Sequence, residues 1–348
     1  MAELEKFAAV RIRKGDNYAT KNFAFTGKFI YAEYHHDNSR LLDPQLHTHN
    51  VIVNVTQDSD GTFKALDSTQ MYQAIRYAGK SYQNALAREC VRLGYELDIK
   101  RSDKGEITGF EIKGIDEEIL KRCSRRRHQI DKAIEEFVAK KGRQPTAEEV
   151  KTMTLLTRNR KMLEKSETEV ETFKRSLLTA PERQRLYVLA ENARIMGDLR
   201  FMDVEEQDAI QQISKVAAQL FERQSVLKLD ALLAEVQNQH LGETDLEVLQ
   251  TALQSVPGLV NLKSPAGNPY FTTEENLQRE NYAIETVNNT KGLLPDLTSS
   301  YRPFSEIEDT YDHSAQTKVI NDILENKDPF MVFRGVAGAG KTSTLQEL

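Results

Sequence analysis

The chain has no tryptophan, only two cysteines and few aromatic residues. Cys90 and Cys123 both lie in helical patterns, which excludes a disulfide framework and a cysteine-based metal site. Aromatic residues make up only 7 % of the sequence, so few side chains are available for stacking on flat ligands. No apolar run reaches the roughly 18–20 residues of a membrane span, and the N-terminus is charged rather than signal-like. We therefore expect a cytoplasmic protein without a membrane segment.

Positive charge is scarce only in the second part of the chain. The first 200 residues carry 36 Lys and Arg against 30 Asp and Glu, and the remaining residues carry 11 against 23. A mildly basic first part fits contact with phosphates, whereas the acidic remainder is a poor surface for them. The basic run at 121–128 could serve such contact or be only a solvated helix face. A length of 348 residues indicates about two or three domains.

Histidine, by contrast, is concentrated in one place. Four of the seven histidines are His35, His36, His47 and His49. Residues 28–36 and 46–55 have strand patterns, and a polar loop with Asp-Pro joins them. If the strands pair as a hairpin, His36 lies beside His47, and His47 and His49 point to one face. Three imidazoles that converge from one side leave an open position on a cation, as in catalytic metal sites.

This interpretation has alternatives. A His-x-His pair on a strand can simply face water, but the third histidine and the rigid turn favour a metal site formed by His36, His47 and His49. Asp37 is predicted to be a turn carboxylate rather than a ligand. Three neutral imidazoles suit Zn²⁺, Mn²⁺, Ni²⁺ or Cu²⁺, whereas phosphoryl chemistry suits Mg²⁺ or Mn²⁺.

A second motif lies near the end of the chain. Residues 328–334 are predicted to form a short buried strand that leads into residues 335–342, which fit G-x-x-x-x-G-K-[ST]. In such a loop the backbone N–H groups surround phosphates, Lys341 reaches the β and γ positions, and Thr342 ligates Mg²⁺. The alternative is a chance glycine-rich turn. The predicted site for ATP with Mg²⁺ comprises Gly335, Gly338, Ala339, Gly340, Lys341, Thr342 and Ser343.

The histidine segment also carries a resemblance. His36-x10-His47-Thr48-His49, with Ser39-Arg40 and Asp43-Pro44-Gln45-Leu46 between, resembles the three-histidine motif of conjugative relaxases of the TrwC/TraI type. The resemblance extends through residues 61–67, 72–94 and 110–130. It implies an endonuclease that acts on single-stranded plasmid DNA at an origin of transfer, together with the conjugation machinery. It also implies that the histidines hold a divalent cation against the scissile phosphate, which a tyrosine then attacks.

The chain departs from the family pattern. The family's paired nucleophilic tyrosines and an assisting carboxylate lie well before its histidines, and this chain begins 35 residues before His36. Tyr18, Tyr31 and Tyr34 do not match the paired pattern, and we predict that Tyr31 and Tyr34 pack a sheet. No catalytic nucleophile is therefore expected in this chain, and covalent catalysis would lose its first step.

Downstream of the relaxase, the family has a RecD-like helicase. Gln316, which opens a predicted helix through Ile323, resembles the glutamine that superfamily 1 helicases place on the adenine ring. A glutamine in a first helical turn is otherwise simply solvated. The P-loop helix ends at Leu348, so we expect a fragment of a relaxase–helicase trimmed at both ends.

The predicted fold class is α+β. We expect an antiparallel-sheet relaxase palm at 1–130, and a helical arm at 131–225 with a capping box at Thr146 and Glu149. A winged-helix-like module would follow at 226–300, with a wing at 264–268 and a helix capped at Thr272. It could equally be a small adaptor. An incomplete P-loop α/β start occupies 301–348.

Two classes of function remain open at this point. The first is a metal-dependent DNA-nicking relaxase with ATP-driven unwinding, here incomplete. The second is a catalytically inactive fragment that binds single-stranded DNA or nucleotide. A metal-dependent hydrolase unrelated to DNA would need a general base near the histidines, and the sequence offers no persuasive one.

Overall fold

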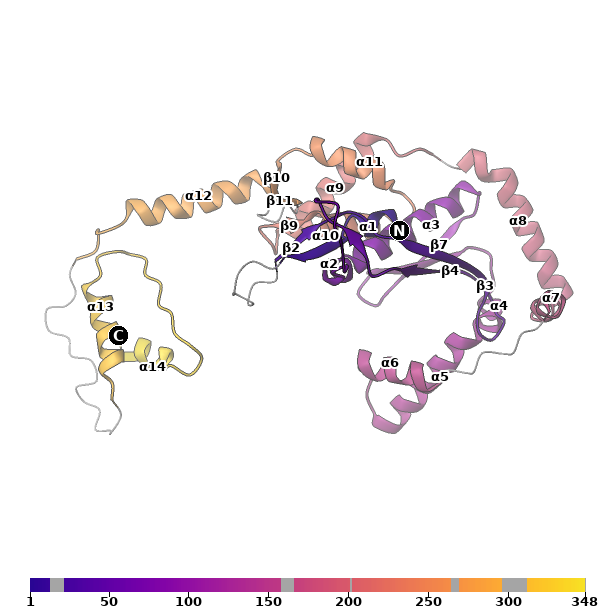
Figure 1. Ribbon diagram of the computed structural model, residues 1–348, viewed down its shortest axis with the longest axis horizontal. Coiled ribbons are helices and arrows are strands. Elements are labelled where there is room, and N and C mark those ends of the chain that lie inside the picture. Colours follow the sequence, from indigo (N-terminus) through magenta and orange to yellow (C-terminus); the bar gives the residue numbers. More distant parts are fainter. Residues whose placement is uncertain (13–21, 158–165, 201, 264–268, 296–311, 348) are drawn as a thin grey trace. The chain divides into compact units, whose positions relative to one another are not determined.

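The computed structural model describes residues 1–12, 22–157, 166–200, 202–263, 269–295 and 312–347 (Figure 1). The chain divides into two compact units, Met1–Phe271 and Thr272–Leu348. Tyr18 and the predicted wing turn at 264–268 lie outside the described residues. No helix in the described part of the chain is both long and apolar enough to cross a membrane.

The first unit mixes helices with antiparallel strand pairs, as predicted. Three pairs of strands form separate antiparallel ladders. The first joins β1 (Ala9–Ile12) to β2 (Asn22–Phe25). The others join β5 (Thr56–Gln57) to β6 (Phe63–Lys64) and β7 (Leu97–Arg101) to β8 (Ile107–Ile112). A three-stranded sheet has the order β10 (Leu259–Lys263), β11 (Pro269–Thr273), β9 (Leu227–Lys228). Among the described residues these are separate small sheets, not one continuous palm.

The two longest strands, β3 (Tyr31–Asn38) and β4 (Pro44–Ile52), form the predicted hairpin (Figure 1). Tyr31 pairs with Ile52 at one end, and His36 pairs with His47 near the turn. The register shifts between His36 and Asn38, and in the loop that follows the Asp43 N–H donates to the Ser39 hydroxyl. The hairpin register therefore confirms the sequence prediction for these strands.

The main core of this unit is helical. It is built by α9 (Glu206–Phe221), α10 (Leu229–Gln239), α11 (Leu246–Ala252) and the short η1 (Leu253–Ser255), and α3 (Ile75–Arg92) packs on α10. The largest side chains without exposed surface here are Ile213, Leu232, Leu233 and Leu249. Because α9 lies inside this core, the predicted boundary at 225/226 does not coincide with a break in packing.

The helical stretch that follows Ser68 is divided in two. It breaks at Ala74, between α2 (Thr69–Gln73) and α3, and it ends before Gly94, which has a φ of +90°. A Cβ at Gly94 would lie 1.9 Å from the carbonyl oxygen of Ala193, so only glycine permits this approach to α8 (Ala180–Arg200).

Between these parts runs the predicted series of charged helices. They are α4 (Glu117–Cys123), α5 (Arg125–Lys141), α6 (Ala147–Leu156), α7 (Glu167–Ser176) and α8. The capping box of Thr146 and Glu149 is present, and Ser166 and Glu169 form a second one. Helices α5, α6 and α7 contain no buried residue, as expected of an arm rather than a core.

In the second unit, α12 (Glu274–Asn289) is capped by Thr273 and not by Thr272 as predicted. The Thr273 hydroxyl accepts a hydrogen bond from the Asn276 N–H, whereas Thr272 is buried in β11. The predicted helix around Gln316 is α13 (Ser314–Glu325), and a short α14 (Lys341–Glu347) follows the glycine-rich loop.

The prediction of a strand at 328–334 is wrong. Residues 329–334 have no strand pairing within the described part of the chain, and Phe330, Met331 and Val332 are exposed. A parallel strand is stable only when neighbours cover its edges and both faces, and nothing among the described residues of this unit supplies them. An apolar pattern alone is therefore not sufficient to form this strand.

Candidate functional site

The β3–β4 hairpin brings three imidazoles to one face. His36 is directly opposite His47, and Tyr34 is directly opposite His49. Because alternate residues of a strand share a face, Tyr34, His36, His47 and His49 all project from the same side. His35 projects from the other side, where its Nδ1 lies 3.0 Å from the Thr48 hydroxyl.

The three rings are nearly equidistant. Their centroids are separated by 5.3 Å for His36 and His47, 5.2 Å for His36 and His49, and 4.9 Å for His47 and His49. Nδ1 of His47 is 3.0 Å from the carbonyl oxygen of Gln45. A ring that donates from Nδ1 to a carbonyl has the Nε2 lone pair free for a cation.

The ring spacing can be compared with that of a metal centre. A metal–nitrogen bond of about 2.1 Å puts ring centroids roughly 5 Å apart around a tetrahedral cation, close to the spacing observed here. As the side chains stand, however, no group of three or more His, Cys, Asp or Glu in the described residues is arranged to hold a metal ion. The histidines fit a cation in type, number and spacing, and ring rotation would be needed to turn their nitrogens to one point.

Asp37, at the end of β3, belongs to a different interaction. Its Oδ2 lies 2.8 Å from Nζ of Lys174 on α7, and its Oδ1 accepts a hydrogen bond from Asn38. The hydrogen bond from Lys174 is the largest cause that lowers the pKa of the Asp37 carboxyl. Asp37 therefore ties the hairpin end to α7, in addition to its hydrogen bond within the loop.

The loop between the two strands is held by Arg125, the first residue of α5. Asp43 is 2 % exposed, and its Oδ1 lies 2.6 Å from Nε of Arg125. Arg125 also donates to the carbonyl oxygen of Leu41, and its guanidinium carbon lies 4.8 Å from the ring centroid of Phe173. The Ser39 hydroxyl lies 3.3 Å from the second oxygen of Asp43. We call Arg125, Asp43 and Leu41 the loop clamp.

Three consecutive arginines of the basic run at 121–128 have partners within the protein, and Arg125 of the loop clamp is the first of them. Arg126 donates to the carbonyl oxygens of Thr154 and Thr157, which joins α5 to the end of α6. Arg127 pairs with Asp131 on the surface of the same helix. Arg125 and Arg126 are thus structural residues, neither a solvated face nor a free surface for phosphate. Sequence reasoning missed this because the partners lie about 30 to 80 residues away.

The tyrosines differ in their surroundings. Tyr31 contacts Phe29, with ring centroids 5.6 Å apart, but it is 39 % exposed, so the predicted packing is only partial. Tyr34 was predicted to pack as well, but it is 54 % exposed and stands on the histidine face. The prediction for Tyr34 is wrong, because that face is not covered by another described element.

The glycine-rich loop lies in the second unit. Nζ of Lys341 is 2.8 Å from the carbonyl oxygens of both Gly335 and Val336, so the loop folds around its own lysine. Gly338 and Gly340 have φ values of +79° and +69°. Gln316 borders the loop, since a Cβ at Gly340 would lie 2.5 Å from its Nε2. Ala339 completes the turn, and Thr342 and Ser343 lie in the first turn of α14.

These observations can now be set beside known proteins. The TrwC relaxase family matches residues 1–180, about half of the chain. The class of protein is therefore a relaxase, and the chain belongs to the TrwC relaxase family.

Individual relatives match a similar stretch. The multifunctional conjugation protein TraI of Escherichia coli is 33 % identical over 154 residues, and TraI of strain K12 is 30 % identical over 154 residues. Each match covers 42 % of this chain, but the chain spans only 8 % of the length of these relatives.

Solved structures of the conjugative relaxase TrwC are also similar. A metal-free complex with origin-of-transfer DNA is 29 % identical with a TM-score of 0.43, covering 51 % of this chain and 59 % of that one. A metal-bound complex is 30 % identical with a TM-score of 0.42, covering 51 % and 58 %.

Proposed function

We propose that this chain is the cation- and DNA-binding part of a conjugative relaxase. His36, His47 and His49 would hold one divalent cation, Mg²⁺ or Mn²⁺ with Zn²⁺ as the alternative, at the scissile phosphate of single-stranded plasmid DNA at an origin of transfer. The gathering of the three imidazoles on one hairpin face carries this proposal. Membership of the TrwC relaxase family supports it.

Each residue has a separate task in this proposal. The carbonyl oxygen of Gln45 would fix the tautomer of His47, so that Nε2 faces the cation. The loop clamp would hold the two strand ends at the spacing that His36 and His47 need. When bound, a divalent cation polarises a phosphate oxygen and stabilises the charge that develops on it. Because the histidines approach from one face, the opposite side remains open for the DNA.

Cleavage requires more than this site. A covalent relaxase step transfers the phosphate from a DNA oxygen to a tyrosine oxygen, so it needs a positioned tyrosine nucleophile. None of Tyr18, Tyr31 and Tyr34 matches the paired pattern of the family. We therefore propose that this chain binds the strand without forming a covalent adduct.

A nucleotide function is the second candidate. We propose that Gly335, Gly338, Ala339, Gly340, Lys341, Thr342, Ser343 and Gln316 form an ATP–Mg²⁺ site of the RecD-like type, with residues 226–300 as a winged-helix-like module or adaptor before it. The positive φ values of Gly338 and Gly340 support close approach of backbone to phosphate. Work with the conjugation machinery and a cytoplasmic location belong to the same proposal. ATP-driven unwinding would be the activity of a whole relaxase–helicase and is not proposed for this loop alone.

The proposal is tested by binding a labelled transfer-origin strand. Fluorescence anisotropy should show tighter binding with Mn²⁺ than with EDTA, and the metal-dependent gain should disappear in His49→Ala. His35→Ala is the matched control, because His35 lies on the same strand pair but faces away. Equal binding with and without metal, or an equal loss in both variants, would contradict the proposal. An adduct on denaturing gels would contradict the expected lack of cleavage.

A further inference from the structure

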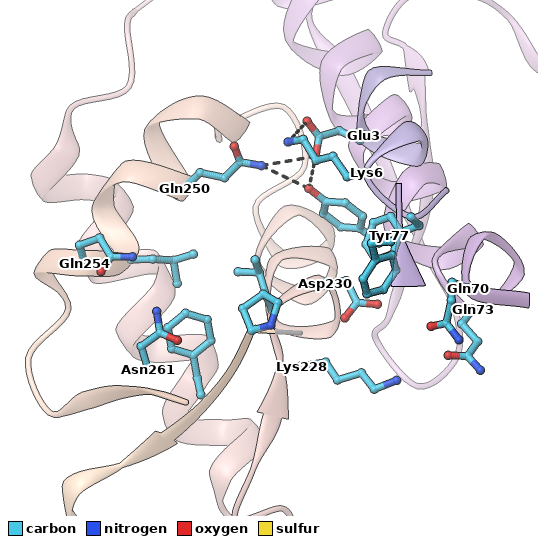
Figure 2. A pocket seen from close by; sticks show the side chains of 16 residues that line it. Glu3, Lys6, Gln70, Gln73, Tyr77, Lys228, Asp230, Gln250, Gln254 and Asn261 are labelled. Carbon is cyan, nitrogen blue, oxygen red and sulfur yellow. Dashed lines mark hydrogen bonds and ion pairs between the residues drawn. The ribbon is translucent and has the colours of Figure 1, made fainter. Parts of the chain in front are cut away.

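A cavity of about 490 Å³ lies within the first unit (Figure 2), and none of its lining residues comes from the β3–β4 hairpin. Residues from two distant parts of the sequence form it. Phe7, Phe25 and Tyr77 come from the first hundred residues, and Gln250, Asn261 and Phe271 come from the helical core and the sheet beside it. The volume falls in the range of about 300–1,000 Å³ that is usual for small-molecule sites.

Aromatic rings supply flat, apolar surface in this cavity. Phe7, Phe25, Tyr77 and Phe271 all line it. Phe7 and Phe25 are half-buried and offer ring surface to the cavity, whereas Tyr77 and Phe271 are buried core residues, 4 % and 3 % exposed. Phe7 and Tyr77 are in edge-to-face contact, with ring centroids 6.0 Å apart. Flat surfaces of this kind accept a planar ligand by stacking.

Carboxamides surround the aromatic surface. Figure 2 shows Gln254 and Asn261 on one side and Gln70 and Gln73 on the other, with Gln250 at one end. A carboxamide presents a donor and an acceptor side by side, and this pair matches the edge of a nucleobase.

One end of the cavity is held in place by hydrogen bonds. The Tyr77 hydroxyl donates to Oε2 of Glu3 at 2.5 Å, and Nε2 of Gln250 lies 3.4 Å from both groups (Figure 2). Burial is the largest cause that raises the pKa of Tyr77 far above its ordinary value, and the tyrosine is therefore neutral. This end is a preformed polar wall rather than a set of free side chains.

The charges of the lining residues balance. Glu3 and Asp230 carry two negative charges, and Lys6 and Lys228 carry two positive ones. Nζ of Lys6 lies 2.7 Å from Oε1 of Glu3, so part of this charge is already neutralised. A balanced site favours an uncharged planar group over a phosphate.

We propose that this cavity takes one unstacked nucleobase of a single DNA strand. The strand's sugar–phosphate backbone would remain outside, the base would stack on the rings, and the carboxamides would contact its edge. The inference rests on the proposed DNA function for the class of ligand, but it uses no residue of the histidine face. The cavity would thus hold the strand at a second point.

An abasic scan tests this inference in the full chain. Anisotropy is measured with 12-nucleotide strands that lack one base at a time. One position should weaken binding about fivefold or more, the size expected for loss of one stacked base. This position effect should show little dependence on salt, because counterion release accompanies phosphate contacts and not base stacking.

Paired variants locate the effect. Gln254 and Asn261 are both exposed, so the double variant Gln254→Leu, Asn261→Leu should fold and lose the position effect. Gln207→Leu is the control, since Gln207 is exposed on α9 outside the cavity. His49→Ala should retain the effect, and this distinguishes failure here from failure of the proposed metal site.

Photo-cross-linking gives an independent readout. A strand with 4-thiothymidine at the sensitive position should form cross-links to the half-buried cavity residues Phe7 or Phe25. The inference would be overturned if no single missing base weakened binding more than the others. Cross-links found only on the β3–β4 hairpin would also overturn it. Free deoxynucleosides that bind as tightly as the strand would also overturn it, because the cavity would then be a nucleoside site.

Discussion

Asp43 is the residue whose environment is most unusual near the histidines. Its carboxylate is almost fully buried, and Arg125, which is more than sixty residues away in sequence, supplies the nearest cation. A buried carboxylate is tolerated only when it is paired and hydrogen-bonded, and Arg125 and Ser39 meet that need. The clamp therefore couples α5 to the loop that separates His36 from His47.

Removal of the clamp should cost both stability and metal affinity. Arg125→Ala leaves the Asp43 carboxylate buried without its cation, and we expect a loss of about 1–3 kcal/mol in the free energy of unfolding. Metal affinity should fall roughly tenfold or more, as for other residues that position ligands. Urea unfolding and titration calorimetry measure the two effects.

Arg127→Ala is the matched control for this prediction. Arg127 lies two residues further along α5, and its ion pair among the described residues is with Asp131 on an exposed helix face. Such pairs contribute about 0.3–0.5 kcal/mol. If Arg125→Ala and Arg127→Ala had equal effects, the loop clamp would have no special role.

Asn84 determines how one element docks on another. It is buried on α3, where its Nδ2 donates to the carbonyl oxygen of Thr244 and its Oδ1 accepts from the N–H of Gly242, both at 2.8 Å. These two bonds satisfy the backbone of the turn between α10 and α11. They join the strand-rich first part of the unit to its helical core.

Asn84→Leu should therefore loosen this junction. The buried carbonyl of Thr244 and the half-buried N–H of Gly242 lose their partners, and a buried group left unsatisfied costs about 1–3 kcal/mol. We expect a lower urea midpoint and faster hydrogen exchange around residues 240–246. Gln83→Leu, at the neighbouring half-buried position, should change stability by no more than about 0.5 kcal/mol. Unchanged exchange in Asn84→Leu would show that the junction is held by apolar packing alone.

The secondary-structure elements differ in how well the sequence predicts them. The β3–β4 register was predictable because strand alternation and a short polar loop are local properties. The clamp was not, since nothing near Arg125 in sequence indicates Asp43 as its partner. The strand at 328–334 failed for the opposite reason: its local pattern was apolar, but strand formation depends on neighbours that the pattern does not contain.

At the scale of the whole molecule, the two units differ in the contacts that hold the histidine hairpin and the glycine-rich loop in place. The hairpin is anchored to α5 and α7 by ion pairs. The glycine-rich loop in the second unit is preceded by exposed apolar residues, and its lysine is engaged by its own carbonyl oxygens. A nucleotide would have to displace these bonds, and the described residues of this unit contain no strand that braces the loop.

We accordingly expect weak nucleotide binding and no ATP turnover. Fluorescent ATP analogues should bind weakly, and Lys341→Ala should abolish this binding, because the ammonium is the proposed partner of the phosphates. A steady-state phosphate-release assay should show no hydrolysis. ATP hydrolysis that is lost in Lys341→Ala would contradict this expectation, as would protection of residues 329–347 from proteolysis.

The central claim for the whole molecule is the cation site, and titration calorimetry with Mn²⁺ or Zn²⁺ tests it most directly. The wild-type chain should bind one divalent ion, His49→Ala should lose measurable binding, and His35→Ala should retain it. Protons compete with the metal for the ring nitrogens, so affinity should fall as the pH is lowered. Absence of binding in the wild-type chain, or equal binding in His49→Ala, would contradict the assignment of His36, His47 and His49.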